Sequence, residues 1–309
     1  MHVKQLRWII GLAVCFAWGV VMLGAYTRLT NAGLGCPDWP GCYGKMNLPV
    51  ALDALTEMVH RYCAGTLGCF ILLAFGLGRQ YKLAWILVGL VLVQAALGMW
   101  TVTLKLLPVV VMGHLLGGIL IFTLLFCFFL QLREQVCLYL PGWHKATLLG
   151  VLIVFLQIAL GGWVSSNYAG LACFGFPQCN GSWLPALKFM PAFDVFAPIG
   201  ANYQGGLLEN EARVTIQMIH RIGACVTALY VLGLSLLMMK VVKVSRVRWM
   251  ARVIIMLIVL QFILGILNVI YLLPLPIAVA HNGIGALLLA CMAGLSYLIS
   301  GEKDAACAR

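Results

Sequence analysis

The chain has 309 residues, of which 63% are hydrophobic and only 9% are charged, and its mean hydropathy is +1.02. Soluble domains carry about 25% charged residues, so the composition excludes a soluble globular protein and indicates an integral membrane protein. The formal net charge is +11, and the placement of the basic residues decides whether it reflects a nucleic-acid partner or membrane topology.

Eight segments are long and apolar enough to cross a membrane, which takes about 20 residues in a helix. In chain order they are 8–27, 57–78, 83–104, 109–131, 146–165, 214–239, 250–271 and 277–299. The predicted fold class is therefore an all-α integral membrane protein with eight transmembrane helices.

The basic residues concentrate on one side of these spans. With an even number of spans both termini share a side, and that side holds 13 of the 20 basic residues against three of the nine acidic ones. This bias predicts that both termini lie in the cytoplasm and that the loops after the first and fifth spans lie outside. The charge then indicates topology, and we expect no nucleic-acid partner.

Those two outer loops carry one sequence pattern. GAYTRLTNAGLGCPDWPGCYG at Gly24–Gly44 and GGWVSSNYAGLACFGFPQCNG at Gly161–Gly181 share eight identical residues at a constant offset of 137. The offset then changes to 160 and later to 167, where histidines match in pairs: His60 with His220, and His114 with His281. The chain is therefore predicted to contain an internal repeat.

Each half contains four spans, so both halves enter the membrane from the same side and the repeat is parallel. The expected architecture is two pseudosymmetric four-helix bundles. We place the N-terminal bundle at residues 1–135 and the C-terminal bundle at residues 136–309.

The four paired histidines are the candidate metal ligands. In each half the second and fourth spans both run inward, and each carries one histidine near its outer end. Two imidazoles that face each other across a bundle core suit axial ligation of a haem iron, whereas a structural zinc site needs four ligands. Hydrogen-bonded core histidines are the alternative, which is weaker for four residues in register inside a membrane.

The residues beside the first histidine of each pair differ between the halves. In both halves an arginine, Arg61 or Arg221, follows this histidine. Its side chain is suited to bind a haem propionate; alternatively, it extends to the lipid head groups. Three residues before the histidine, Glu57 matches Gln217. A carboxylate can transfer protons or stabilise charge, so we predict a reactive N-terminal site and an electron-holding C-terminal site; alternatively, Glu57 faces outer water at a helix start.

The run TRLTNAGLGCPDWPGCYG, the paired EMVHR and QMIHR and the two later histidines resemble the heme A synthase family over essentially all eight spans. The resemblance implies oxidation of a porphyrin methyl group of heme O to a formyl group by successive hydroxylations, giving heme A for cytochrome oxidases. It implies that His220 and His281 bind a heme b cofactor. It assigns His60 and His114 to the iron of the substrate heme O, and it makes Glu57 catalytic.

Four of the 12 cysteines lie in the outer loops, and the resemblance matches them to the family's pairs, Cys36–Cys42 and Cys173–Cys179. Equal spacing and an oxidising compartment favour two intraloop disulfides, with a four-thiolate zinc site as the alternative. We interpret the pairs as staples of a lid above the haem edge, or as redox-active groups, foremost in the N-terminal loop. The other eight cysteines are expected to be inert thiols.

The resemblance also implies a bacterial inner (cell) membrane location, heme O synthase and cytochrome oxidase assembly factors as partners, and a membrane electron donor, quinol or another. The competing interpretations are a bis-histidine b-type cytochrome that relays electrons from quinol, and a transporter built on the repeat. The oligomeric state is left open, with a homo-oligomer as one alternative.

Overall fold

The computed structural model describes residues 2–133, 138, 140–195, 200 and 202–301. Eight helices in this part of the chain are long and apolar enough to cross a membrane. They are α1 (His2–Leu29), α2 (Leu52–Gly78), α3 (Lys82–Thr103), α4 (Pro108–Arg133), α5 (Pro141–Ser166), α7 (Asn210–Val241), α8 (Ser245–Ile270) and α9 (Leu275–Leu298). The eight predicted spans are confirmed, and each helix begins before its predicted span.

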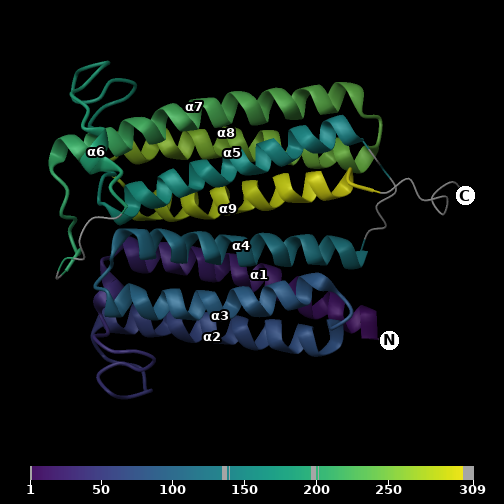
Figure 1. The fold of residues 1–309 in the computed structure, drawn as a ribbon, viewed down its shortest axis with the longest axis horizontal. Coiled ribbons are helices and arrows are strands. Elements are labelled where there is room, and N and C mark those ends of the chain that lie inside the picture. Colours follow the sequence, from purple (N-terminus) through teal and green to yellow (C-terminus); the bar gives the residue numbers. More distant parts are fainter. Residues whose placement is uncertain (1, 134–137, 139, 196–199, 201, 302–309) are drawn as a thin grey trace, which may run out of the picture.

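The long helices form two groups, α1–α4 and α5 with α7–α9, which lie side by side in Figure 1. Within each group the contacts close a ring, since α1 packs on α2 and α4, and α5 packs on α7 and α9. The groups meet along α1, α4, α5 and α9. The predicted boundary at residues 135 and 136 lies outside the described residues.

Close contacts at small residues hold the two groups together. Gly162 of α5 lies against Met112 and Leu115 of α4, where an added Cβ would collide with their side chains. On the other side of the seam, the indole Nε1 of Trp18 donates a hydrogen bond of 2.9 Å to the carbonyl oxygen of Gly283. Small residues that admit close helix approach, and interhelical hydrogen bonds, are the usual means of helix association in membranes.

The backbone repeats at the sequence offsets. The described non-glycine residues with positive φ form four pairs at offsets of 137 or 167: Asn31 and Tyr168, Tyr43 and Asn180, Lys105 and Leu272, Leu106 and Leu273. The turns after α3 and α8 also share hydrogen bonds, such as 2.8 Å bonds from Leu106 N–H to Thr101 O and from Leu273 N–H to Asn268 O. These matches agree with the predicted internal repeat.

The loop between α5 and α7 is the longer of the two outer loops and contains the short helix α6 (Phe189–Ala192). It reaches the first helix group, because Tyr203 N–H donates to the carbonyl oxygen of Lys105 at 3.0 Å. Trp163 Nε1 fixes it from below through a 2.8 Å bond to the carbonyl oxygen of Ala192. The loop between α5 and α7 therefore covers the seam between the two helix groups.

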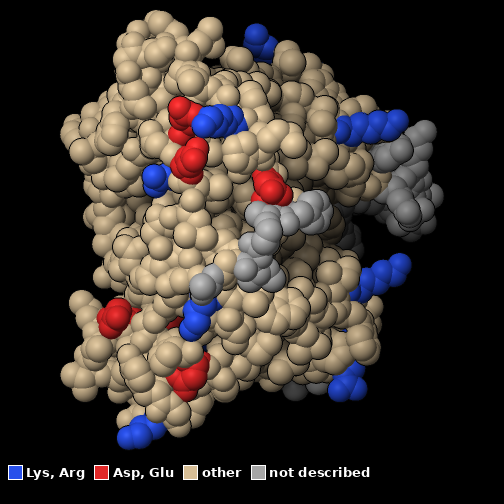
Figure 2. Space-filling view, turned by 60° about the vertical axis from the view of Figure 1, so that its left-hand side comes forward, with Lys and Arg blue, Asp and Glu red and all other residues tan. Residues whose placement is uncertain are grey.

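Charge is distributed unequally between the two ends of the helices. The six described acidic residues all lie in the long loops or in the first two turns of the helices after them. Figure 2 turns this end forward and shows the acidic side chains on it, mixed with basic ones. The connections at the opposite end, α2–α3 and α7–α8, carry basic residues and, in their described parts, no acidic residue.

Candidate functional site

The histidines lie well inside their helices. α2 begins at Leu52 with Asp53 in its first turn, where an acid stabilises the helix dipole, so His60 lies about two turns into the helix and does not open it. His114 lies six residues after Pro108, the first residue of α4. Both positions are close to the loop end of parallel helices, as the sequence predicted.

The structure brings His60 and His114 together. Their ring centroids are 6.5 Å apart and the ring planes are 83° apart. An imidazole nitrogen binds a metal ion at about 2 Å, so two rings on opposite sides of one ion have centres roughly 6 Å apart. The observed spacing therefore fits one iron between the two rings.

A glycine of a neighbouring helix lies against each ring. The four contacts are Gly24 with His60, Gly98 with His114, Gly161 with His220, and Gly265 with His281. An added Cβ would lie 3.0 Å from the ring Cε1 in the first two contacts and 3.2 Å in the last two. Any larger residue would displace the ring, so the glycines fix the ring positions; the sequence showed these glycines as repeat matches but not their contact with the histidines.

Three of the rings contain a buried polar atom without a partner. The Nδ1 atoms of His60, His114 and His281 make no hydrogen bond to any described residue. A buried polar atom without a partner calls for an explanation, and a functional role or a bound ligand is one. Axial ligation of a haem iron uses one nitrogen of each ring, so the residues present fit this group.

A glutamine lies beside three of the four histidines. Gln157 Nε2 donates to the carbonyl oxygen of His220 at 3.0 Å and lies 3.0 Å from its Nδ1. Gln94 Nε2 donates to the carbonyl oxygen of His114 at 2.8 Å. Gln261 Nε2 lies 3.3 Å from His281 Nε2.

The fourth glutamine is missing from the repeat. At the offset of 137, the residue that matches Gln157 is Val20, whose side chain has no polar atom. Gln94 and Gln261 match at the offset of 167, but the repeat does not reveal Gln157, because its mate has a different chemical character. His60 is thus the one histidine of the four whose matched glutamine position is apolar.

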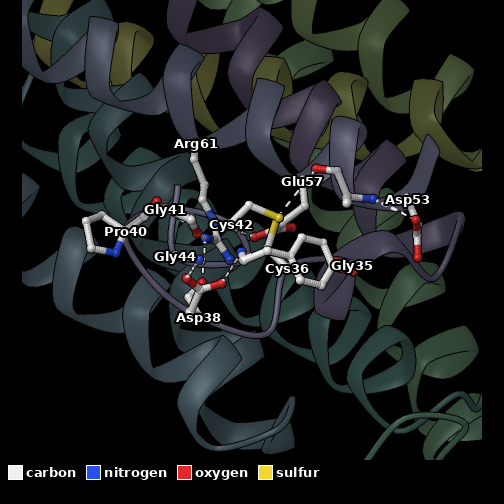
Figure 3. The surroundings of a disulfide bond; sticks show 12 residues. Gly35, Cys36, Asp38, Pro40, Gly41, Cys42, Gly44, Asp53, Glu57 and Arg61 are labelled. Atoms are coloured by element: carbon white, nitrogen blue, oxygen red, sulfur yellow. Dashed lines mark hydrogen bonds and ion pairs between the residues drawn. A yellow bond between two sulfur atoms is a disulfide. The ribbon is translucent and has the colours of Figure 1, made fainter. Parts of the chain in front are cut away.

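Glu57 is buried and ion-paired. Its residue is 7% exposed, and its Oε1 accepts a hydrogen bond of 3.0 Å from Arg61 Nε one helical turn later. Figure 3 shows Arg61 reaching from α2 between Glu57 and the first loop. The alternative that Glu57 merely faces outer water is therefore wrong.

Arg61 also holds the loop above the site. Its Nη1 donates to the carbonyl oxygens of Asp38 at 2.7 Å and Gly41 at 2.6 Å. The remaining donor, Nη2, is buried and has no partner among the described residues. Neither of the two predictions for Arg61, propionate binding or snorkelling, included these loop contacts. Nη2 of Arg61 is the donor that remains available for an anionic group.

The matching residues of the second half are arranged differently. Arg221 donates to the carbonyl oxygens of Gln178 at 3.2 Å and Cys173 at 2.8 Å, so it ties its own loop in place. Its Nε and the Oε1 of Gln217 are both buried without a partner in the part of the chain that the structure describes. The arginine–loop contact is therefore shared by the halves, and the ion pair belongs to the first.

The outer-loop cysteines form two disulfides, Cys36–Cys42 and Cys173–Cys179, with Cα atoms 4.9 Å apart in each. The sulfurs are thus committed to disulfides, and the described residues include no group of three or more histidine, cysteine or acidic side chains that could hold a metal ion. The first disulfide packs on Ala54 and Met58 of α2. Of the other eight cysteines, Cys137 and Cys307 lie outside the described residues.

A second contact closes the first loop. Asp38 accepts hydrogen bonds of 2.7 Å from the backbone N–H groups of Tyr43 and Gly44. The bond from Gly44, followed by that from Tyr43, holds the pKa of Asp38 below its ordinary value of 3.8. In the second loop Gly175 matches Asp38, and a neutral side chain closes the loop instead: Asn180 Oδ1 accepts from Phe174 N–H at 2.9 Å.

Comparison with known proteins gives consistent matches over the whole chain. The COX15-CtaA family model, described as cytochrome oxidase assembly protein, matches residues 6–56 and 50–293. The heme A synthase of Shewanella oneidensis is 39% identical, over 96% of this chain and 97% of the relative. The heme A synthases of Alkalihalophilus pseudofirmus and Rhizorhabdus wittichii are each 26% identical, over 91% and 93% of this chain and 93% and 91% of the relatives.

Proposed function

The chain belongs to the COX15-CtaA family of cytochrome oxidase assembly proteins, and from this premise we propose that it catalyses the oxidation of heme O to heme A. The reaction is an oxidation of a porphyrin methyl group to a formyl group by successive hydroxylations. The observation that carries the proposal is the facing pair His60 and His114 beside the buried carboxylate of Glu57, in a chain similar to heme A synthases over its whole length.

We assign the two sites different roles. The N-terminal half, residues 1–135, takes heme O between His60 and His114. The C-terminal half, residues 136–309, holds a heme b cofactor between His220 and His281, and this group supplies one-electron redox chemistry when bound. The placement of Glu57 in one half and Gln217 in the other supports the assignment, because electron transfer needs no titratable carboxylate.

Within the substrate site, the chain's own residues orient and protect the reacting group. Arg61 Nε holds Glu57 Oε1 in place, so that the carboxylate can accept or deliver a proton at the methyl carbon, or stabilise positive charge there. Arg61 Nη2 and the corresponding arginine of the other half, Arg221, are suited to haem propionates. The disulfide loops above the sites exclude outer water.

We further propose a bacterial inner membrane location with both termini in the cytoplasm and the disulfide loops outside. The basic connections at the end opposite the disulfide loops support this orientation. The proposed partners are heme O synthase, cytochrome oxidase assembly factors and a membrane electron donor.

Conversion of heme O tests the function directly. The purified protein is given heme O with a reductant and oxygen, and its haems are extracted and separated. We expect heme A to form with time. A cytochrome that only relays electrons would leave heme O unchanged, and a purified protein without a Soret absorption band would exclude both haem functions.

A further inference from the structure

A groove runs along the outer surface of the first helix pair. It has a volume of about 500 Å³ and lies between α1 and α2, with apolar side chains and Gly19 along α1 from Leu12 to Leu23, and Cys63 on α2. Leu12, Cys15 and Gly19 are exposed, so the groove opens toward the surrounding lipid. An added Cβ at Gly19 would meet no heavy atom of the described chain within 4 Å.

The outer end of the groove lies near His60, whose ring does not itself line it. Leu23 precedes Gly24, whose added Cβ would lie 3.0 Å from the His60 ring. Cys63 follows His60 by three residues and therefore shares its side of α2. From Leu23 to Leu12 the helix descends by about 16 Å, so the groove leads from the histidine toward the middle of the membrane.

Two positions along the groove carry larger side chains in the second half. At the offset of 137, Leu152 matches Cys15 and Leu156 matches Gly19. Both leucines lie on the outer surface of α5, 51% and 52% exposed. The contact with the histidine is shared by the halves, because Gly24 and its mate Gly161 each lie against a histidine ring.

We propose that this groove binds the prenyl tail of heme O, an inference that rests on the proposed function. The groove is apolar, ends one residue from Gly24, which contacts the assigned iron ligand, and points away from the polar loops. If each chain carbon takes up about as much space as a water, whose share of liquid volume is about 30 Å³, the groove accepts on the order of 15 of them.

A tail attached to a bound haem also competes well with membrane lipid. Once the iron lies between the histidines, the tail is held beside the groove at a high effective concentration. A free acyl chain has no such attachment. The leucines at the matching positions of α5 leave less room for a tail, so the second site is suited to a haem that carries none.

The variant Gly19→Leu tests the proposal by giving α1 the residue found at position 156. The protein, with its resident haem in place, is titrated with heme O and with a haem that lacks the tail, and binding is followed by absorption. The added leucine would take up space that the tail needs, whereas a haem without a tail does not reach it. We expect heme O to bind about tenfold or more weakly, and the haem without a tail to bind as in the wild type.

Two further variants keep this test decisive. Cys15→Leu copies Leu152 one turn away and is expected to act in the same direction, which provides a second probe if Gly19→Leu does not fold. Gly89→Leu adds a leucine to an exposed, open position of α3 outside the groove and is expected to change neither affinity.

An unchanged affinity of folded Gly19→Leu for heme O, or an equal loss for both haems, would overturn the groove assignment. If the wild type converts heme O to heme A in the same preparation, the proposed function survives that result. If the wild type neither binds nor converts heme O, the proposed function itself fails, and the tail groove fails with it.

Discussion

The two helix groups share one scaffold and differ beside the histidines. Both close a ring of four helices, both place a glycine against each histidine ring, and both use an arginine after the first histidine to hold a disulfide loop. The residues that hold the histidines and the loops in place are therefore repeated. What differs is the chemistry next to the first histidine and the space on the outer helix surface.

Three differences all distinguish the N-terminal half. A buried carboxylate, Glu57, stands where the other half has Gln217. Val20 stands where Gln157 contacts His220. Cys15 and Gly19 lie on the outer face of α1 where α5 carries Leu152 and Leu156. Together they describe a site with a reactive group, a less restrained ligand and an opening to lipid, as expected for a substrate that enters and leaves.

Removal of one histidine from each half should separate the two roles most strongly. We expect His60→Ala to lose heme A formation, by more than 100-fold, while keeping the heme b spectrum, because loss of groups that only support a metal ligand already costs 10–100-fold. His220→Ala should lose heme b itself. Absorption spectra and extracted haems of both proteins measure this, and a full haem complement in both variants would contradict the ligand assignment.

Exchange of the residues at positions 57 and 217 tests the chemical asymmetry. Glu57→Gln should lower heme A formation by about 10²–10⁴-fold, the range expected for a general acid or base, with heme O still bound. Gln217→Glu is the matched control: its carboxylate can pair with the unpartnered Nε of Arg221, and we expect turnover to stay within a few-fold of wild type. Full activity of Glu57→Gln would contradict a catalytic role of Glu57 and leave it only the ion pair with Arg61.

The sequence predicted the spans and the pairing of the histidines because both depend on local or repeated patterns. Apolar runs of sufficient length determine the spans, and the position of each histidine near the outer end of an inward-running span places His60 and His114 at one depth. The partners of Arg61 could not be predicted, since the carbonyl oxygens of Asp38 and Gly41 reach it only after the loop has folded. The groove beside Gly19 likewise depends on how α1 and α2 pack, which no single segment reveals.

Gln157 distinguishes the restrained histidine from the less restrained one. In Gln157→Val, which copies Val20, His220 loses its amide contact, and we expect heme b to bind about tenfold more weakly, at the low end of the range for supporting groups. The ratio of heme b to protein after dilution and gel filtration measures the loss. The reverse variant, Val20→Gln, should leave heme b retention unchanged, and equal retention in Gln157→Val and wild type would show that the contact has no positioning role.

The smallest expected difference lies between the two loops and depends on pH. The pKa of Asp38 is lowered below 3.8 by its bonds from Gly44 and Tyr43, so the ionised carboxylate stabilises the loop above that pH, and this contribution is lost as the pH falls through the lowered pKa. The second loop uses the amide of Asn180, which does not titrate in this range. We therefore expect both disulfides to resist reduction equally from pH 8 to pH 5 and Cys36–Cys42 alone to become more accessible in stronger acid. Reduction by a phosphine, followed for each pair by mass spectrometry, measures this; Asp38→Asn should remove the pH dependence, and an identical acid response of both pairs would contradict the role of the carboxylate.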